Sequence, residues 1–163
     1  MAVDAKTGQA IFGRYNVGLH NVGSYQSSGK PFITGSAHSA ADRVHMVEFP
    51  SVSKSFTVIN TGAADAAIRV HFQSGSTTAA APITKPGLSG EAAIAAADDV
   101  IAGNHFITVG NGASVTFDTK CHKFYISSET ADTSYQVLAE LTNIPTDRMY
   151  HLTGSGITST DGS

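Results

Sequence analysis

Short runs in which apolar and polar residues alternate are the feature that most restricts how this chain can fold. From residue 55 to 60 and from 66 to 73, apolar side chains recur at every second position, which is the period of a strand with one buried face. Similar short runs cover residues 43–49, 105–109, 114–118, 120–127 and 135–142. These runs, with hardly any helical period, predict an all-β fold, an antiparallel β-sandwich or jelly roll, whose strand order stays open.

Turn residues between the runs predict two hairpins. The segment 61–65 joins the first two runs and holds Gly62, which can take positive φ, and Asp65, which can bond its own backbone. Asn111 and Gly112, a strong hairpin dipeptide, separate residues 105–109 from 114–118. We therefore expect the two strands of each pair to be hydrogen-bonded neighbours.

The composition divides the chain into an N-terminal arm at 1–36, a single sandwich domain at 37–152 and a flexible tail at 153–163. The tail is nearly all Gly, Ser, Thr and Asp, a composition that cannot offset ordering entropy by burial. Inside the domain, residues 74–103 form a long loop in which 91–98 could make a helical turn or two. The arm, with glycines spaced between aromatic residues, is expected to lie on another surface; alternatively, it adds an edge strand to its own sandwich.

Charge and hydropathy restrict the partners. Charged residues make up 14% of the 163 residues, well below the usual quarter, and on a β-rich chain this favours a surface covered by neighbours. The net charge of -3 gives no positive field of the kind that drives binding to nucleic acid. No apolar run approaches membrane-spanning length and no signal peptide is recognisable, so we expect no membrane partner and a soluble protein of the cytoplasm, or one released by lysis.

Motifs for catalysis are missing from the sequence. No G-x-S-x-G pentapeptide occurs, and the single cysteine, Cys121, permits neither an intrachain disulfide nor a multi-cysteine zinc site. Cys121 and His122 are neighbours on a predicted strand, where adjacent side chains point to opposite faces and cannot readily activate each other. Gly110 and Gly112 lie between two strands, which favours a turn over a phosphate-binding loop.

The histidines show no metal-binding spacing. None of the H-x-H, H-x-x-x-H or H-E-x-x-H patterns occurs. The seven histidines are His20, His38, His45, His71, His105, His122 and His151. We interpret His71, beside Arg69 and Gln73, as part of a solvated strand face, and predict a protein that is not an enzyme and that has no metal or other cofactor.

A carbohydrate-binding module is the alternative that the sequence leaves open. Such sandwiches often use exposed Trp or Tyr as platforms, and this chain has no Trp. Tyr15, Tyr25 and Tyr150 remain as possible platforms. The alternative function is therefore a host-surface or carbohydrate-recognising sandwich, as in a fibre or adhesin.

Two blocks of sequence carry a resemblance to a known group of proteins. They are VGLHNVGSYQSSGKPFITGS at residues 17–36, and the strands SFTVINTG at 55–62 with SVTFD at 114–118. Together they resemble small virion structural proteins of tailed bacteriophages, particularly marine ones. The likeness covers most of the chain and contains no catalytic motif.

The resemblance implies a decoration or cement protein on a capsid, or in a related neck or tail position, within a virion assembled in the host cytoplasm. Its partners would be the major capsid protein or other virion subunits, and further copies of itself in a homo-oligomer. A rigid sandwich with an apolar-aromatic arm suits this role, since such an arm becomes ordered only against a neighbour. The predicted interface anchors are Phe12, Tyr15, Leu19, Val22, Tyr25 and Phe32.

Overall fold

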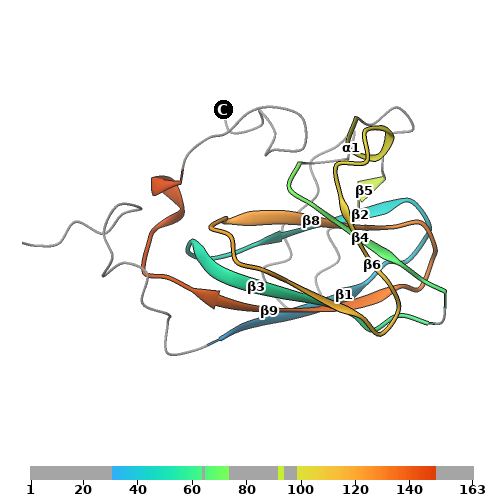
Figure 1. Ribbon diagram of the computed structural model, residues 1–163, viewed down its shortest axis with the longest axis horizontal. Helices are drawn as coiled ribbons and strands as arrows, with labels where there is room; N and C mark the ends of the chain where they lie inside the picture. The colour runs from blue at the N-terminus through green and yellow to red at the C-terminus, as the bar shows by residue number, and fades with distance from the viewer. Residues whose placement is uncertain (1–30, 64, 74–91, 94–98, 150–163) are drawn as a thin grey trace, which may run out of the picture.

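The computed structural model describes residues 31–63, 65–73, 92–93 and 99–149. In this part of the chain, two antiparallel sheets stack face to face as a sandwich (Figure 1). The four-stranded sheet has the order β1 (Phe32–Ala37), β9 (Ser134–Leu141), β3 (Ser53–Asn60) and β7 (Ser114–Phe117). The five-stranded sheet has the order β5 (Ala92–Ala93), β2 (Arg43–Glu48), β8 (Lys123–Ser128), β4 (Ile68–His71) and β6 (Ile107–Val109). The predicted all-β sandwich is confirmed.

The strands pair in a nested pattern, with the first joined to the last. Strand β1 pairs with β9, β2 with β8, β3 with β7 and β4 with β6, all antiparallel. Additional pairings of β3 with β9 and of β4 with β8 complete the two sheets. Among these eight strands, only the connection from β4 to β6 begins and ends in the same sheet.

Both predicted hairpins are wrong, although their strands exist. Strands β3 and β4 lie in opposite sheets, and so do β6 and β7. The turn at Asn111 shows why: Ala113 N–H donates to Gly110 C=O at 3.1 Å, and φ is positive at Gly112 (68°) but not at Asn111. A two-residue hairpin of type I′ needs positive φ at both central residues, and the turn found here instead splays the strands towards different sheets.

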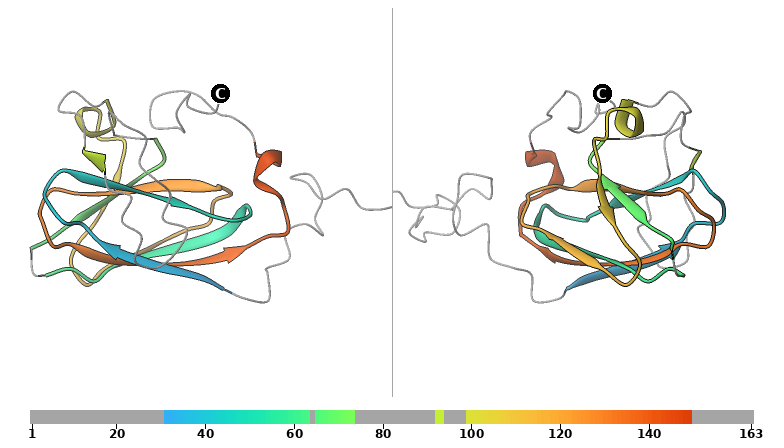
Figure 2. Two further views of the ribbon diagram at one scale, coloured as in Figure 1. Left: turned by 180° about the vertical axis from the view of Figure 1, so that it is seen from behind. Right: turned by 45° about the vertical axis from the view of Figure 1, so that its right-hand side comes forward.

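The long connection between β4 and β6 differs from its predicted structure. Ala92 and Ala93, within the segment expected to form a helical turn, instead pair with β2 as strand β5. A single helical turn, α1, follows at Asp99–Ala102. Figure 2 shows α1 and β5 together on the side of the five-stranded sheet that faces away from β1 and β9. A short 3₁₀ helix, η2 (Thr146–Arg148), follows β9.

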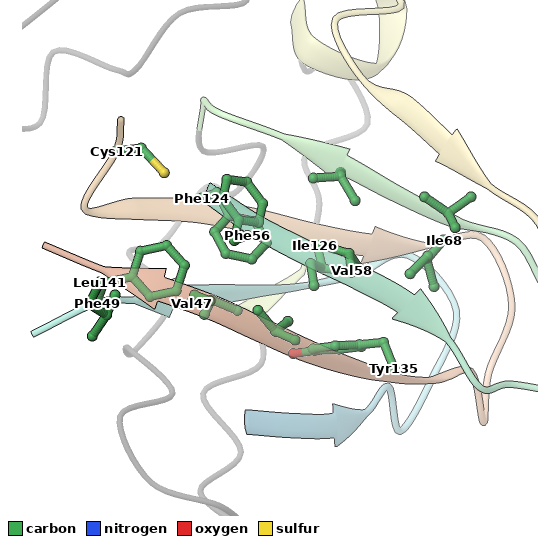
Figure 3. Packing of buried hydrophobic residues seen from close by; sticks show 14 residues of the cluster. Val47, Phe49, Phe56, Val58, Ile68, Cys121, Phe124, Ile126, Tyr135 and Leu141 are labelled. Carbon is green, nitrogen blue, oxygen red and sulfur yellow. The ribbon is translucent and has the colours of Figure 1, made fainter. Parts of the chain in front are cut away.

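Aromatic side chains form the centre of the core between the sheets (Figure 3). The ring of Phe56 on β3 stacks on Phe124 of β8 at 4.4 Å and on Phe117 of β7 at 4.9 Å. Phe49 lies 5.6 Å from Phe124, and Phe49, Phe56 and Phe124 are at most 1% exposed. Burial of each such ring contributes roughly 2–3 kcal/mol, so these contacts between β3 and β8 supply much of the attraction between the sheets.

A buried amide connects the two sheets at the point where the chain passes from β3 to β4 and from β6 to β7. The side chain of Asn60, at the end of β3, is 1% exposed. Its Nδ2 donates to Ala66 C=O (2.7 Å) and to Val109 C=O (2.9 Å), and its Oδ1 accepts from Gly62 N–H (2.9 Å). Its backbone bonds to Ala113 and Gly112 across the second crossover. One residue thus joins β3, the start of β4, the end of β6 and the turn before β7.

We predict that Asn60→Asp destabilises the fold by roughly 3 kcal/mol or more, because a buried carboxyl would oppose two carbonyl oxygens that now accept from Nδ2. Urea unfolding of the wild type and the variant measures the difference. Asn111→Asp is the matched control, since the side chain is exposed in the neighbouring turn and the same change there should cost under about 0.5 kcal/mol. Equal effects of the two substitutions would contradict the bridging role of Asn60.

Candidate functional site

The predicted anchor residues are only partly within the described structure. Phe12, Tyr15, Leu19, Val22 and Tyr25 lie outside the described residues. Phe32 lies in β1, where its ring packs edge-on against Phe49 at 5.3 Å and 88°. Residues 32–36, assigned to the arm, are therefore part of the sandwich, and Phe32 packs against its core.

The outward surface of the four-stranded sheet is a candidate for an interface. One row runs across all four strands in register: Ile33 of β1, Leu138 of β9, Thr57 of β3 and Thr116 of β7. The adjacent row consists of Gly35, Gln136, Ile59 and Ser114. We call these eight residues the open face.

The open face is apolar at one edge and uncharged throughout. Ile33 is 64% exposed and Leu138 is 43% exposed, and they are direct cross-strand neighbours. Beside them, the hydroxyls of Thr57 and Thr116 bond to each other at 2.8 Å. None of the eight residues is ionisable. A contiguous surface of this kind is typical of a contact with another protein.

Charges begin at the end of the open face. Lys54 Nζ lies 3.2 Å from Glu140 Oε2, and both side chains are about half exposed. An exposed pair of this kind contributes little to stability. Opposite charges at the rim can, however, set the orientation of a partner.

Sequence reasoning missed Ile33 and Leu138. In a sequence, an outward-facing Leu on a strand looks like a core residue. The usable signal was the run Tyr135–Leu141, in which Val137 and Ala139 occupy the inward positions, so Leu138 between them had to face outward.

The structure brings together two histidines that the sequence analysis treated as unrelated. The rings of His38 and His45 stack at 4.3 Å, and both side chains are fully buried. His45 Nδ1 lies 2.8 Å from the Tyr135 hydroxyl, and His38 Nε2 donates to Ile126 C=O at 3.1 Å. This cluster is a hydrogen-bonded polar part of the core. Within the described residues, no group of three or more His, Cys, Asp or Glu could hold a metal ion.

His71 is buried, which corrects the prediction of a solvated position. It is 1% exposed, and its ring stacks on Tyr125 at 5.8 Å and 12°. Nδ1 donates to Gln73 C=O at 2.6 Å, so Nε2, 3.1 Å from Ser127 Oγ, accepts from that hydroxyl in the neutral ring. Burial lowers the pKa of His71 to about 4, and the nearby charge of Arg69 acts in the same direction.

The thiol of Cys121 is also buried. Its Sγ lies 3.5 Å from Ser53 Oγ, and desolvation raises the pKa of Cys121 to about 12. The thiol therefore stays protonated near neutral pH. Its environment gives no support to a role as a nucleophile.

A small pocket lies beside the start of β1. It has a volume of about 260 Å³ and is lined by Phe32, Glu48, Phe49, Pro50 and Thr146. Because Phe49 is almost fully buried, the accessible wall comes mainly from the other four residues. The pocket carries one carboxylate, Glu48, and no second group positioned for chemistry with it.

Comparisons with known proteins gave no match: no family model, no curated protein and no solved structure is similar to this chain. Among the described helices, none has both the length and the apolar character needed to cross a membrane.

We predict that the fold loses stability as the pH falls from about 6.5 to about 4. In this window the unfolded chain binds a proton at His71 that the folded chain does not. The contribution of the neutral buried ring to the free energy of unfolding is therefore complete above pH 6.5 and is lost near pH 4. The stability lost through His71 between pH 6.5 and pH 4 amounts to about 3 kcal/mol. Urea unfolding at several pH values should show a flatter profile for His71→Asn than for the wild type.

The control is Asn111→Ala, which changes a side chain that does not ionise at an exposed position and should leave the shape of the profile unchanged. If His71→Asn and the wild type lose stability in parallel between pH 6.5 and 4, His71 is not the group that titrates.

Proposed function

We propose that this chain is a non-enzymatic virion structural protein, a decoration or cement protein that binds the major capsid protein or other virion subunits and stabilises the shell. The observation that carries the proposal is the open face, an uncharged sheet surface with the neighbouring Ile33 and Leu138 exposed. Exposed apolar neighbours on a flat sheet supply contact area that a partner can bury.

The strand pairing supports the proposal. The nested pairs β1/β9, β2/β8, β3/β7 and β4/β6 are those of an antiparallel hairpin rolled into two sheets, so we assign a jelly roll, an architecture found in viral capsid proteins and in lectins. A fold alone does not decide function. It does supply a rigid platform whose flat outer surface can lie on a lattice.

The mechanism would be binding linked to assembly. A protein that binds the assembled shell but not free subunits lowers the free energy of the shell by mass action, and more so as its concentration rises above the dissociation constant. A low content of charged side chains, 14%, suits a surface that is largely covered in the virion. The virion, assembled in the host cytoplasm, would be the site of action.

The alternative, a glycan-binding module of a fibre or adhesin, lacks a specific observation in its favour. The two tyrosines that the structure describes, Tyr125 and Tyr135, are each 1% exposed. Neither can act as a platform for a sugar ring. Tyr15, Tyr25 and Tyr150 lie outside the described residues.

The test is co-sedimentation of the purified chain with emptied shells of the virus that encodes it. We expect saturable binding and a raised melting temperature of the decorated shell. Leu138→Glu should weaken binding roughly tenfold or more, because it places a charge in the apolar part of the open face. Ile107→Glu is the matched control, since Ile107 is 50% exposed on β6 of the other sheet.

Absence of binding to shells by the wild type, with saturable binding to host-surface glycans, would replace the cement proposal with the adhesin alternative. Equal weakening by Leu138→Glu and Ile107→Glu would remove the open face as the binding surface.

A further inference from the structure

Strand β1 ends the four-stranded sheet within the described residues, and the strand itself lacks three of the usual protections of an edge: a charge, a proline and a bulge. Its six residues, Phe-Ile-Thr-Gly-Ser-Ala, include no charge and no proline. Its register with β9 is regular from Phe32 to Ala37, without a bulge. Natural edge strands normally avoid new pairing through such devices, so an unprotected edge is a template for a further strand.

The hydrogen bonds at the end of β1 show which backbone groups face that edge. His38 N–H donates to Thr133 C=O at 3.0 Å, whereas Ser134 C=O accepts from Thr61 on the opposite side of β9. Because bonding alternates along an antiparallel pair, the even-numbered residues of β1 bond to β9. The N–H and C=O groups of Ile33, Gly35 and Ala37 are therefore directed to the free edge.

The side chains of these three residues fit a second copy of the same strand. In an antiparallel pair centred on Gly35, Gly35 faces Gly35 of the other copy, and Ile33 faces Ala37. The largest side chain thus meets a small one, and no side chains collide at the centre. A Cβ at Gly35 would lie 2.8 Å from Tyr135 C=O, so the β1–β9 pairing itself already requires a glycine at this position.

We infer that two copies of this chain associate through antiparallel pairing of their β1 strands about a two-fold axis at Gly35. The pairing closes about six backbone hydrogen bonds and joins the two four-stranded sheets into one. Self-association meets no like-charge repulsion at the strand, because β1 is uncharged. This inference goes beyond the proposed function, and it gives an interface to the homo-oligomer that the resemblance to virion structural proteins implies.

The dimer also places both open faces on the same side. A two-fold axis perpendicular to the sheet keeps the outward side of each copy outward. In this register the row of Gly35, Gln136, Ile59 and Ser114 continues into the same row of the other copy, while Ile33 lies beside Ala37 of the other copy. Ile33, the most exposed large apolar residue described, at 64%, then lies two residues from the two-fold axis on the combined surface.

The first experiment is the mass of the full chain by sedimentation velocity across a dilution series, without any particle present. We expect a reversible dimer, weakened roughly tenfold or more by Ile33→Lys, which places two cations beside the new pairing. Ile107→Lys is the matched control: it adds the same charge at an exposed position on β6, the outer strand of the other sheet, and should leave the dimer unchanged.

Hydrogen exchange at the amides of Ile33, Gly35 and Ala37 is the second measurement and does not depend on a variant that folds. Their protection should fall on dilution, in step with the dimer, while the amides of Thr34 and Ser36 stay protected by β9. A monomer at all concentrations, or protection at these three amides that does not change on dilution, would overturn the inference, and the latter would show that the chain covers β1 with its own residues. Either failure leaves binding to shells, measured separately, unaffected.

Discussion

The buried side chain of Asn60 joins the two sheets by hydrogen bonds at the point where the chain crosses between them twice. Elsewhere, the attraction between the sheets comes largely from aromatic rings such as Phe56 and Phe124, stacked at 4.4 Å, and this attraction has little directional preference. The bonds of Asn60 to Ala66 and Val109 add direction. They fix how far one sheet lies along the other.

The sequence was sufficient to predict most strands and the all-β sandwich, but not their pairing. The alternation of apolar and polar residues shows which side chains of a strand are buried. It is the same whether the next strand pairs with it in one sheet or lies in the opposite sheet. For β6 and β7, the backbone conformation of the turn at Gly112 decides between pairing and crossing. The Asn-Gly dipeptide does not reveal that only one of its two residues has positive φ. Strand β1 was expected only as the alternative in which the arm adds an edge strand to its own sandwich, because its outward Ile33 and its glycine disturb the period of two.

For the candidate site too, the sequence indicated the strands but not which residues lie next to one another. The alternation around Leu138 indicates that it points outward but not which residues lie beside it, because its neighbours Ile33 and Thr57 are set by the register of β9 against β1 and β3. In the opposite sense, His71 looked solvated because it is polar, yet it is buried against Tyr125 and Ser127. Contacts between distant segments decide both cases, and local composition contains little of that information.

The nested strand order has a consequence for how the molecule is made. Phe32 lies opposite Ala139 in the finished sheet, so the β1–β9 ladder has a high contact order and cannot form until nearly the whole domain has left the ribosome. Until β9 is available, β1 has no partner strand and is not yet the edge of a sheet. The surface through which we expect copies to recognise one another is thus assembled last during synthesis, which delays self-association until the fold is complete.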